Sequence, residues 1–202
     1  MTGSPKAPRG PWAFVAVFTL CTVGLLGSYR YAIDTVANDW YLFAVARHTA
    51  WILDFVGDEA VMEKYRAENL SPWESWRARA LPRPRDGENG PRVNFTWSPG
   101  ASFTFIVVPS CGAIEVMAIF CAAVMAFPAT WRHRAWGVAL GLPLMYLVNI
   151  ARLACLACLG ALDKSGEWFN FVHEYVWQAG YVIFVVIVWM AWAELGRERG
   201  AG

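Results

Sequence analysis

Five polar residues with chemically useful side chains stand inside or beside long apolar segments of this 202-residue chain. They supply a thiol, a guanidinium, an imidazole, a carboxylate and a carboxamide, and are Cys111, Arg152, His173, Glu115 and Asn149 in that order. Ionisable groups in membrane-length segments are costly, and by default they face one another or a wet cavity. Their placement therefore predicts one shared site.

The thiol, the guanidinium and the imidazole together suit cysteine-based acyl transfer. A thiol in an apolar site is a poor nucleophile because burial raises its pKa, whereas a nearby arginine favours the thiolate. Attack on a peptide carbonyl puts negative charge on oxygen, which a fixed guanidinium can stabilise, and a histidine can protonate the leaving amine. We therefore expect Cys111 as nucleophile, Arg152 as the charge-stabilising residue and His173 as the proton-transfer residue.

Two further residues are expected to support this trio. Asn149 precedes Arg152 by one helical turn and can hold the guanidinium or the substrate carbonyl. Glu115 follows Cys111 by four residues, on the same helical face, and can fix the rotamer of Arg152. Singly, such residues have ordinary structural explanations, such as space filling by cysteine or snorkelling by arginine. The functional interpretation therefore depends on their convergence.

The composition indicates an integral membrane protein. Hydrophobic residues make up 57% of the chain and charged residues only 16%, whereas a soluble domain is about a quarter charged. A net charge of +1 does not favour nucleic acid as a partner, so the lipid bilayer is the expected surroundings. Five cysteines without a secreted-framework spacing predict no disulfide scaffold, and scattered histidines predict no metal site and no cofactor.

Four segments are long and apolar enough to span a bilayer core of about 30 Å. They are residues 12–29, 112–131, 135–162 and 171–192. The first is expected to be an uncleaved anchor, since no cleavage site for a signal peptidase follows it. Residues 38–57 have helical apolar spacing broken by Arg47 and His48, which favours an interfacial or packed helix over a fifth span. The predicted fold class is an all-α polytopic membrane helix bundle of four to five transmembrane helices, a single domain over residues 1–202.

Basic residues predict the orientation. They flank the first span, form the "RHR" turn of residues 132–134 and follow the last span, which places both termini and this turn in the cytoplasm. Residues 30–110 are then extracytoplasmic or interfacial. Arg152 stands roughly 25 Å above the cytoplasmic start of its segment, at the depth where Cys111 and His173 enter the bilayer from outside. All five polar residues share this outer layer of a three-helix core, residues 111–193.

The outer region has two parts of different character. Residues 71–92 are rich in Pro, Arg and Gly and predict an interfacial loop. Residues 93–108 alternate apolar and polar side chains on both sides of Ser98-Pro99-Gly100, which predicts a small extracytoplasmic β-hairpin. Its second arm leads directly to Cys111.

Three short motifs resemble those of a known family. "PSCGAIE", "NIAR" and "FVHEY", in this order on three spans, resemble the Cys, Arg and His boxes of the exosortase/archaeosortase family over residues 103–192. The "HEYVWQ" run and the short chain are similar to the H-type exosortases, whereas "SCGA" differs from many relatives in the residue after the cysteine. The first half of the chain, to about residue 92, carries no such box.

The resemblance implies a multi-pass transpeptidase of the bacterial cytoplasmic (inner) membrane. Its substrates would be membrane-anchored proteins with a C-terminal tail made of a short motif, a transmembrane helix and a basic end. The enzyme would cleave at the motif and pass the protein to an acceptor whose identity stays open. By this resemblance Cys111 matches the nucleophile, Arg152 the arginine and His173 the proton-transfer residue of the family.

Two other functions stay open at the level of sequence. Cys155 and Cys158 form a C-x-x-C pair, which a membrane thiol-disulfide oxidoreductase would use, although such enzymes normally need a second pair or a partner. The polar layer would also serve a non-enzymatic membrane bundle, as hydrogen-bonding glue between helices.

Overall fold

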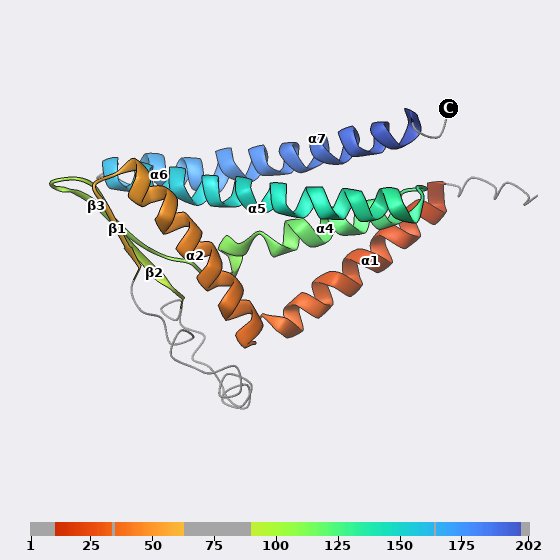
Figure 1. Cartoon of the computed structure of the whole chain (residues 1–202), viewed down its shortest axis with the longest axis horizontal. Helices are drawn as coiled ribbons and strands as arrows, with labels where there is room; N and C mark the ends of the chain where they lie inside the picture. The colour runs from red at the N-terminus through yellow and green to blue at the C-terminus, as the bar shows by residue number, and fades with distance from the viewer. Residues whose placement is uncertain (1–10, 34, 63–89, 164, 199–202) are drawn as a thin grey trace, which may run out of the picture.

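The chain forms an elongated bundle of helices with a small sheet at one end (Figure 1). The computed structural model describes residues 11–33, 35–62, 90–163 and 165–198. The predicted interfacial loop at residues 71–92 therefore lies almost wholly outside the described residues. The long helices are α1 (Pro11–Ala32), α5 (Trp131–Leu162) and a continuous helix made of α6 (Glu167–Phe171), a π-helical turn η4 (Val172–Val176) and α7 (Trp177–Glu198).

Three helices of the described residues are long and apolar enough to cross a membrane. They span Trp12–Ala32, Trp131–Leu162 and Glu167–Gly196, and so correspond to the first, third and fourth predicted spans. The predicted second span is instead the 13-residue helix α4 (Ile114–Ala126), which rises only about 20 Å. Because α4 alone falls short of a core of about 30 Å, the observed bundle has three full-length candidates and one short apolar helix.

The turn between α4 and α5 comes earlier than predicted. Pro128 disfavours helical backbone at Phe127, which adopts φ −65° and ψ 138° and ends α4. Thr130 then caps α5 by accepting a hydrogen bond from the amide of His133. The "RHR" residues therefore form the first turn of α5 and do not form the connection itself.

The helix predicted within residues 38–57 is confirmed as α2 (Val36–Val56). It is not among the helices apolar enough to span, and it packs obliquely across α5 and the sheet (Figure 1). Leu42, Val45 and Leu53 face this packing interface and are buried, whereas Arg47 and His48 are exposed. This is the packed helix that the broken apolar pattern favours.

The sheet contains the predicted hairpin and one strand that was not predicted. β2 (Arg92–Ser98) and β3 (Ala101–Ile106) pair antiparallel, and Gly100 turns the chain between them with φ 86°. β1 (Glu59–Met62) pairs with the other edge of β2, so the order is β1-β2-β3. Val93 and Phe95 on β2 are buried against α2 and α5.

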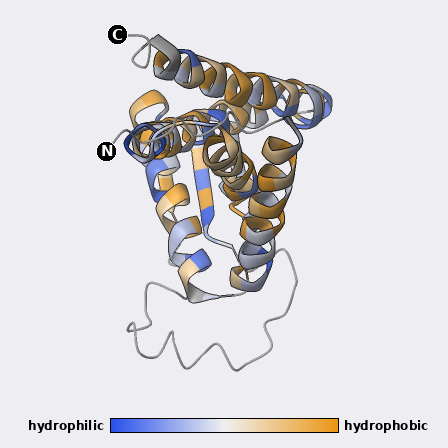
Figure 2. Cartoon of the chain, turned by 90° about the vertical axis from the view of Figure 1, so that its right-hand side faces the viewer, coloured by the Kyte–Doolittle hydropathy of each residue, from blue (hydrophilic) through white to orange (hydrophobic). Residues whose placement is uncertain are grey.

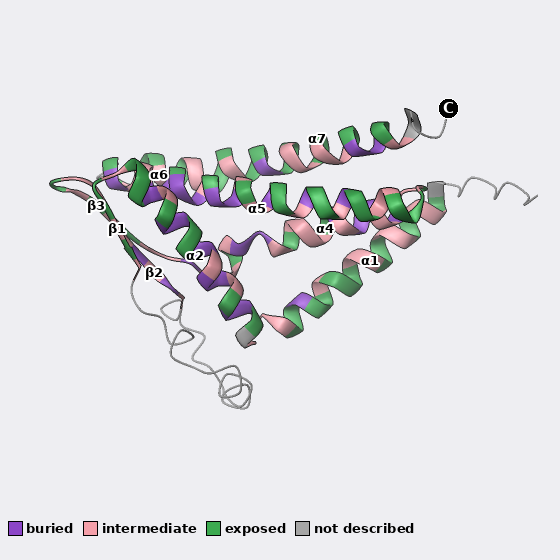
Figure 3. Cartoon of the chain, in the orientation of Figure 1, coloured by how far each residue is buried: buried purple, intermediate pink, exposed green. Residues whose placement is uncertain are grey.

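Two apolar clusters divide the bundle along its long axis, as the buried segments in Figure 3 show. One joins α2, the sheet and the second half of α5, and the other joins α4, α7 and the first half of α5. At the far end of the second cluster, His133 and Trp192 exchange two hydrogen bonds and stack with ring centroids 4.7 Å apart. This contact ties the start of α5 to the end of α7.

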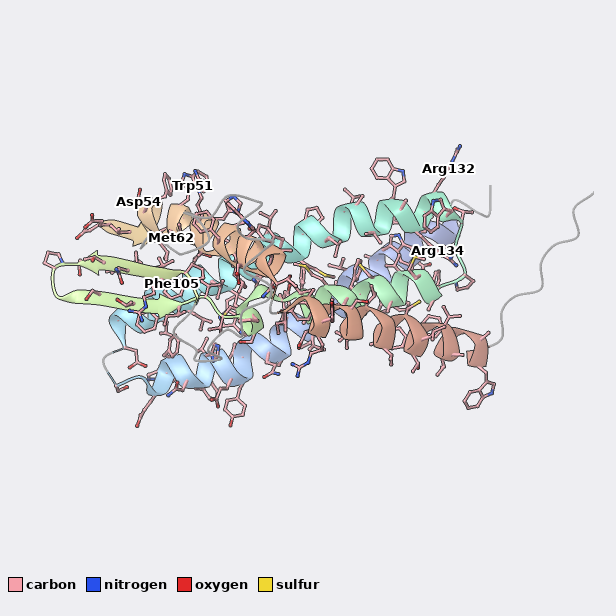
Figure 4. All side chains as sticks on the ribbon, turned by 90° about the horizontal axis from the view of Figure 1, so that it is seen from below. Trp51, Asp54, Met62, Phe105, Arg132 and Arg134 are labelled. Carbon is pink, nitrogen blue, oxygen red and sulfur yellow. The ribbon has the colours of Figure 1, made fainter. Side chains whose placement is uncertain are left out.

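The two ends of the molecule differ in charge and in fold. Arg132 and Arg134 lie at one end, and the labelled residues of α2 and the sheet lie at the other (Figure 4). Between them, the outer faces of α1 and α7 are apolar (Figure 2) and expose large side chains such as Leu20, Ile183 and Ile187. In a spanning bundle such faces contact lipid.

The close packing of α4 on α5 gives a stability prediction. A Cβ atom added at the buried Gly141 would collide with the ring of Phe120, whereas one added at Gly180 meets nothing within 4 Å. Gly141→Ala should therefore lower the free energy of unfolding by about 1–3 kcal/mol through overpacking. Gly180→Ala is the matched control and should be neutral or stabilising. Unfolding of both variants by detergent titration, followed by circular dichroism, measures the difference; equal effects would mean that the two helices do not pack at Gly141.

Candidate active site

Cys111 lies in a short 3-10 turn between the sheet and the membrane helices. This turn, η3 (Pro109–Gly112), follows β3 directly and begins with a proline whose fixed φ suits the first helical position. Ala113 then adopts a left-handed conformation, with φ 55° and ψ 15°, before α4 begins. A non-glycine residue in this conformation is strained by about 1–2 kcal/mol, so the surrounding structure must hold it. We call Pro109–Ala113 the cysteine turn.

Three side chains from three helices donate hydrogen bonds to carbonyl groups of the cysteine turn. The Tyr41 hydroxyl of α2 donates to the Gly112 carbonyl at 2.6 Å, and Asn149 Nδ2 of α5 donates to the Cys111 carbonyl at 2.7 Å. The Tyr29 hydroxyl of α1 donates a longer bond of 3.4 Å to the Pro109 carbonyl. The turn is therefore held from several directions at once.

The absence of a side chain at Gly112 allows Tyr41 to lie close to the backbone of the turn. A Cβ atom at this position would lie 3.0 Å from Tyr41 Cε1 and 3.5 Å from Leu42 Cδ2. The residue after Cys111 is buried, so a side chain there would displace the tyrosine that binds its carbonyl. The close packing of Tyr41 and Leu42 thus explains why a glycine occupies this position in "PSCGAIE".

Arg152 lies one helical turn beyond Asn149 on α5 and is partly buried. Its Nε atom is buried without a hydrogen-bond partner, and within the described part of the chain no carboxylate pairs with its guanidinium. The guanidinium lies within electrostatic range of Tyr181 on α7. It is therefore a buried donor whose hydrogen-bonding capacity is not used up by the protein.

His173 lies in the π-helical turn η4 and stacks on Phe169, with ring centroids 5.8 Å apart and planes 6° from parallel. Phe169 in turn packs on Phe103 of β3, at a centroid distance of 5.2 Å. Among the described residues His173 forms no hydrogen bond to Cys111 or to Arg152. Single π-helical turns inside α-helices are frequent at functional sites.

A capped loop positions the helix that carries His173. The Asp163 carboxylate accepts hydrogen bonds from the Ser165 hydroxyl at 2.6 Å and from the Phe169 amide at 3.0 Å. These bonds stabilise the charged form and hold the pKa of Asp163 below its ordinary value. The loop after α5 therefore enters α6 in a defined direction.

The packing of α5 against α7 gives the relative depths of these residues. The Tyr181 hydroxyl donates to the Met145 carbonyl at 3.0 Å, so these two residues are nearly level. From there α5 rises about 10 Å to Arg152, and the neighbouring helix rises about 12 Å to His173. Asn149, which binds Cys111, lies about 6 Å above Met145. Helical rise thus places the cysteine turn, Arg152 and His173 all beyond Met145, towards the end of the bundle that carries the sheet.

Glu115 is exposed in the first turn of α4 and lies within electrostatic range of Tyr29 on α1. Within the described ranges it forms no ion pair with Arg152, so this structure gives no support to a role in fixing the arginine. Asn149 donates to the backbone carbonyl of Cys111, and among the described residues it forms no hydrogen bond to the Arg152 guanidinium.

The remaining cysteines show no comparable arrangement. All five thiols are free, and Cys155 and Cys158 stand on one face of α5, the first exposed and the second partly buried. Among the residues that the structure describes, no group of three or more His, Cys, Asp or Glu side chains could hold a metal ion.

Comparison with known proteins decides the family. The sequence model of the transmembrane exosortases matches residues 7–193, which is nearly the whole chain. The chain belongs to the transmembrane exosortase family. The family predicted from the motifs is thereby confirmed, while the H-type assignment and the roles of the residues in the three motifs remain predictions. Neither the curated proteins nor the solved structures contain a match to this exosortase.

Sequence reasoning missed the residues of this exosortase that hold the cysteine turn from α1 and α2. Tyr41 and Tyr29 precede Gly112 and Pro109 by 71 and 80 residues. Both tyrosines lie within ordinary amphipathic helical patterns, which give no local signal of such contacts. The carbonyl groups that these tyrosines bind become apparent only from the way α1 and α2 dock on the rest of the fold.

Proposed function

We propose that this exosortase is a membrane-embedded cysteine transpeptidase. It cleaves the C-terminal sorting tail of exported proteins and transfers them to an acceptor on the extracytoplasmic side of the bacterial cytoplasmic membrane. The observation that carries the proposal is the cysteine turn, whose backbone Asn149 holds one helical turn before Arg152 on the same helix. A nucleophile held on a fixed backbone, with a cationic donor on the helix that holds it, suits acyl transfer.

The reaction proceeds in two acyl-transfer steps. The Cys111 thiolate attacks the carbonyl carbon of the scissile peptide, and Arg152 stabilises the resulting oxyanion. His173 protonates the amine of the leaving tail as the C–N bond breaks, which leaves a thioester on Cys111. His173 then removes a proton from the acceptor nucleophile, or from water, as that nucleophile attacks the thioester; the C–S bond breaks, the Cys111 thiolate is released and His173 is again protonated.

The roles proposed for Cys111 and His173 both require bound substrate between the two side chains. His173 stacks on Phe169 and lies at a similar depth to Arg152, without a hydrogen bond to the thiol in the described structure. Catalytic hydrogen bonds in the free enzyme are often long and tighten only when substrate is bound. The peptide between Cys111 and the leaving amine would occupy the space that separates them.

The sheet offers a means of binding the sorting motif. β3 is an edge strand in the order β1-β2-β3, and it runs directly into the cysteine turn. An extended peptide can add to such an edge through main-chain hydrogen bonds. A motif bound along β3 would present its scissile bond near Cys111, while its transmembrane tail remains in the bilayer beside the bundle.

The two ends of the bundle support the proposed orientation. The arginines at the start of α5 favour the cytoplasm, and the sheet lies at the opposite end (Figure 4). The Cys111 carbonyl is bonded to Asn149, about 27 Å along α5 from Trp131. This distance nearly equals the thickness of the bilayer core, which supports a site at the extracytoplasmic boundary.

The first prediction tests the nucleophile and the reaction together. A protein from the same organism that ends in a short motif, an apolar helix and a basic tip should be shortened when co-produced with this exosortase. Cys111→Ala should abolish the shortening while the enzyme still inserts into the membrane, because no other thiol stands on the cysteine turn. The control is Cys155→Ala with Cys158→Ala, which should retain most of the activity. An inactive double variant beside an active Cys111→Ala would instead support the thiol-disulfide function. Electrophoresis of the tagged substrate measures both.

Arg152 gives a second prediction. Lysine keeps the positive charge but loses the planar pair of donors. If Arg152 stabilises the oxyanion, Arg152→Lys should lose about 10²–10³-fold in rate, or about 3–4 kcal/mol of transition-state stabilisation. Steady-state cleavage rates in proteoliposomes measure this loss. A rate within a factor of three of wild type would mean that charge alone suffices or that the residue only anchors the helix.

Paired single cysteines test the orientation. Ser102 on β3 and Arg132 at the start of α5 are both exposed and lie at opposite ends of the molecule. Ser102→Cys should react with a membrane-impermeant thiol reagent in intact cells, whereas Arg132→Cys should react only after the membrane is permeabilised. Labelling is compared with the wild-type background by mass spectrometry. The opposite result would place the site on the cytoplasmic side and exclude surface sorting.

A further inference from the structure

We propose that Tyr41 is a positioning residue for Cys111, acting through the Gly112 carbonyl. Its catalytic consequence rests on the transpeptidase function proposed above. Tyr41 lies on α2, outside the motifs that resemble the family boxes and outside the helices long and apolar enough to span. Among the described residues it forms no hydrogen bond to Asn149, which holds the Cys111 carbonyl, and none to the π-helical turn. Its hydroxyl nevertheless makes the shortest side-chain hydrogen bond to the cysteine turn, at 2.6 Å.

The bond fixes the second peptide plane after Cys111, the one between Gly112 and Ala113. Asn149 holds the carbonyl of Cys111, and Tyr41 holds that of Gly112. A trans peptide is planar, and its N–H points opposite to its C=O. Anchoring two successive carbonyls therefore also fixes the directions of the Gly112 and Ala113 amides. Cys111 has no freedom to rotate into the regular helix of α4, because Ala113 is kept in its left-handed conformation.

Tyr41 is well placed to act as a permanent donor. Its ring lies against the Gly112 backbone and packs edge-on against Tyr146, with ring centroids 6.1 Å apart and planes at 61°. Burial raises the pKa of Tyr41 well above its ordinary value, so the hydroxyl stays protonated throughout the physiological range. A neutral phenol in a fixed position donates to the same carbonyl whatever the state of the thiol.

Positioning of this kind acts on the rate more than on binding. Attack on a carbonyl requires the reacting atoms in near contact, and a misplacement of about 1 Å can lower the rate about 100-fold. Without the hydroxyl, the Gly112 carbonyl loses its donor and the strained turn loses one of its restraints. The thiol then samples orientations that do not lead to attack, while the substrate still binds along β3 and in the bilayer.

The test compares two tyrosine-to-phenylalanine variants in the full-length protein in nanodiscs. Tyr41→Phe removes the hydroxyl that binds Gly112. Tyr146→Phe is the matched control, because it removes a hydroxyl from the neighbouring ring that binds His48 Nδ1 at 2.7 Å and does not reach the turn. Four quantities are measured: hydrogen exchange of the peptide covering residues 109–114, the temperature of unfolding, and kcat and KM for the tailed substrate defined above.

Tyr41→Phe should speed exchange at residues 109–114 and lower kcat about 10-fold, with KM within a factor of two and an unfolding temperature equal to that of Tyr146→Phe. Unchanged exchange, unchanged kcat, or a loss of kcat that follows a lower unfolding temperature would each overturn the proposal, the last by showing a purely structural role. If the wild-type protein leaves the tailed substrate uncut, the proposed function fails. Exchange at residues 109–114 then decides by itself whether Tyr41 holds the turn.

Discussion

Backbone carbonyls that leave regular structure near a membrane must find hydrogen-bond donors within the protein, because lipid supplies none. In this exosortase the cysteine turn presents such carbonyls at Pro109, Cys111 and Gly112, and donors from α1, α5 and α2 satisfy them. The requirement explains why three helices distant in sequence converge on this turn. It also explains how Ala113, two residues after Cys111, can keep a strained backbone.

The length of α5 relates the site to the bilayer. Its 32 residues rise about 48 Å, which exceeds a bilayer core of about 30 Å. The part of α5 beyond this length packs against the sheet and α2, and the cysteine turn lies where these elements meet the spanning helices. α4 can be short because it begins at this level and not at the end of α5.

The polar residues of this layer differ in how completely the protein satisfies them. Asn149 is fully buried and donates its amide nitrogen to the Cys111 carbonyl, but its Oδ1 atom, like the Nε atom of Arg152, is buried without a hydrogen-bond partner. Leaving a buried donor unpaired costs about 1–3 kcal/mol, and more for a charged group. Structural hydrogen bonding between helices would be expected to use this donor. The Nε atom of Arg134, at the opposite end of the bundle, is buried without a partner as well, so this feature is shared by the two arginines.

The amino-acid sequence alone determined the three long apolar helices, the β2–β3 hairpin and the order of the Cys, Arg and His motifs, because each depends on residues close together in the chain. It also predicted that Cys111, Asn149 and Arg152 share a depth, since helical rise converts spacing into distance. Only the tertiary structure decided that β1 joins the sheet, that Asn149 binds the nucleophile's backbone and not Arg152, and that Tyr41 holds Gly112. These contacts depend on how helices and strands far apart in sequence dock, and neither periodicity nor propensity encodes that docking.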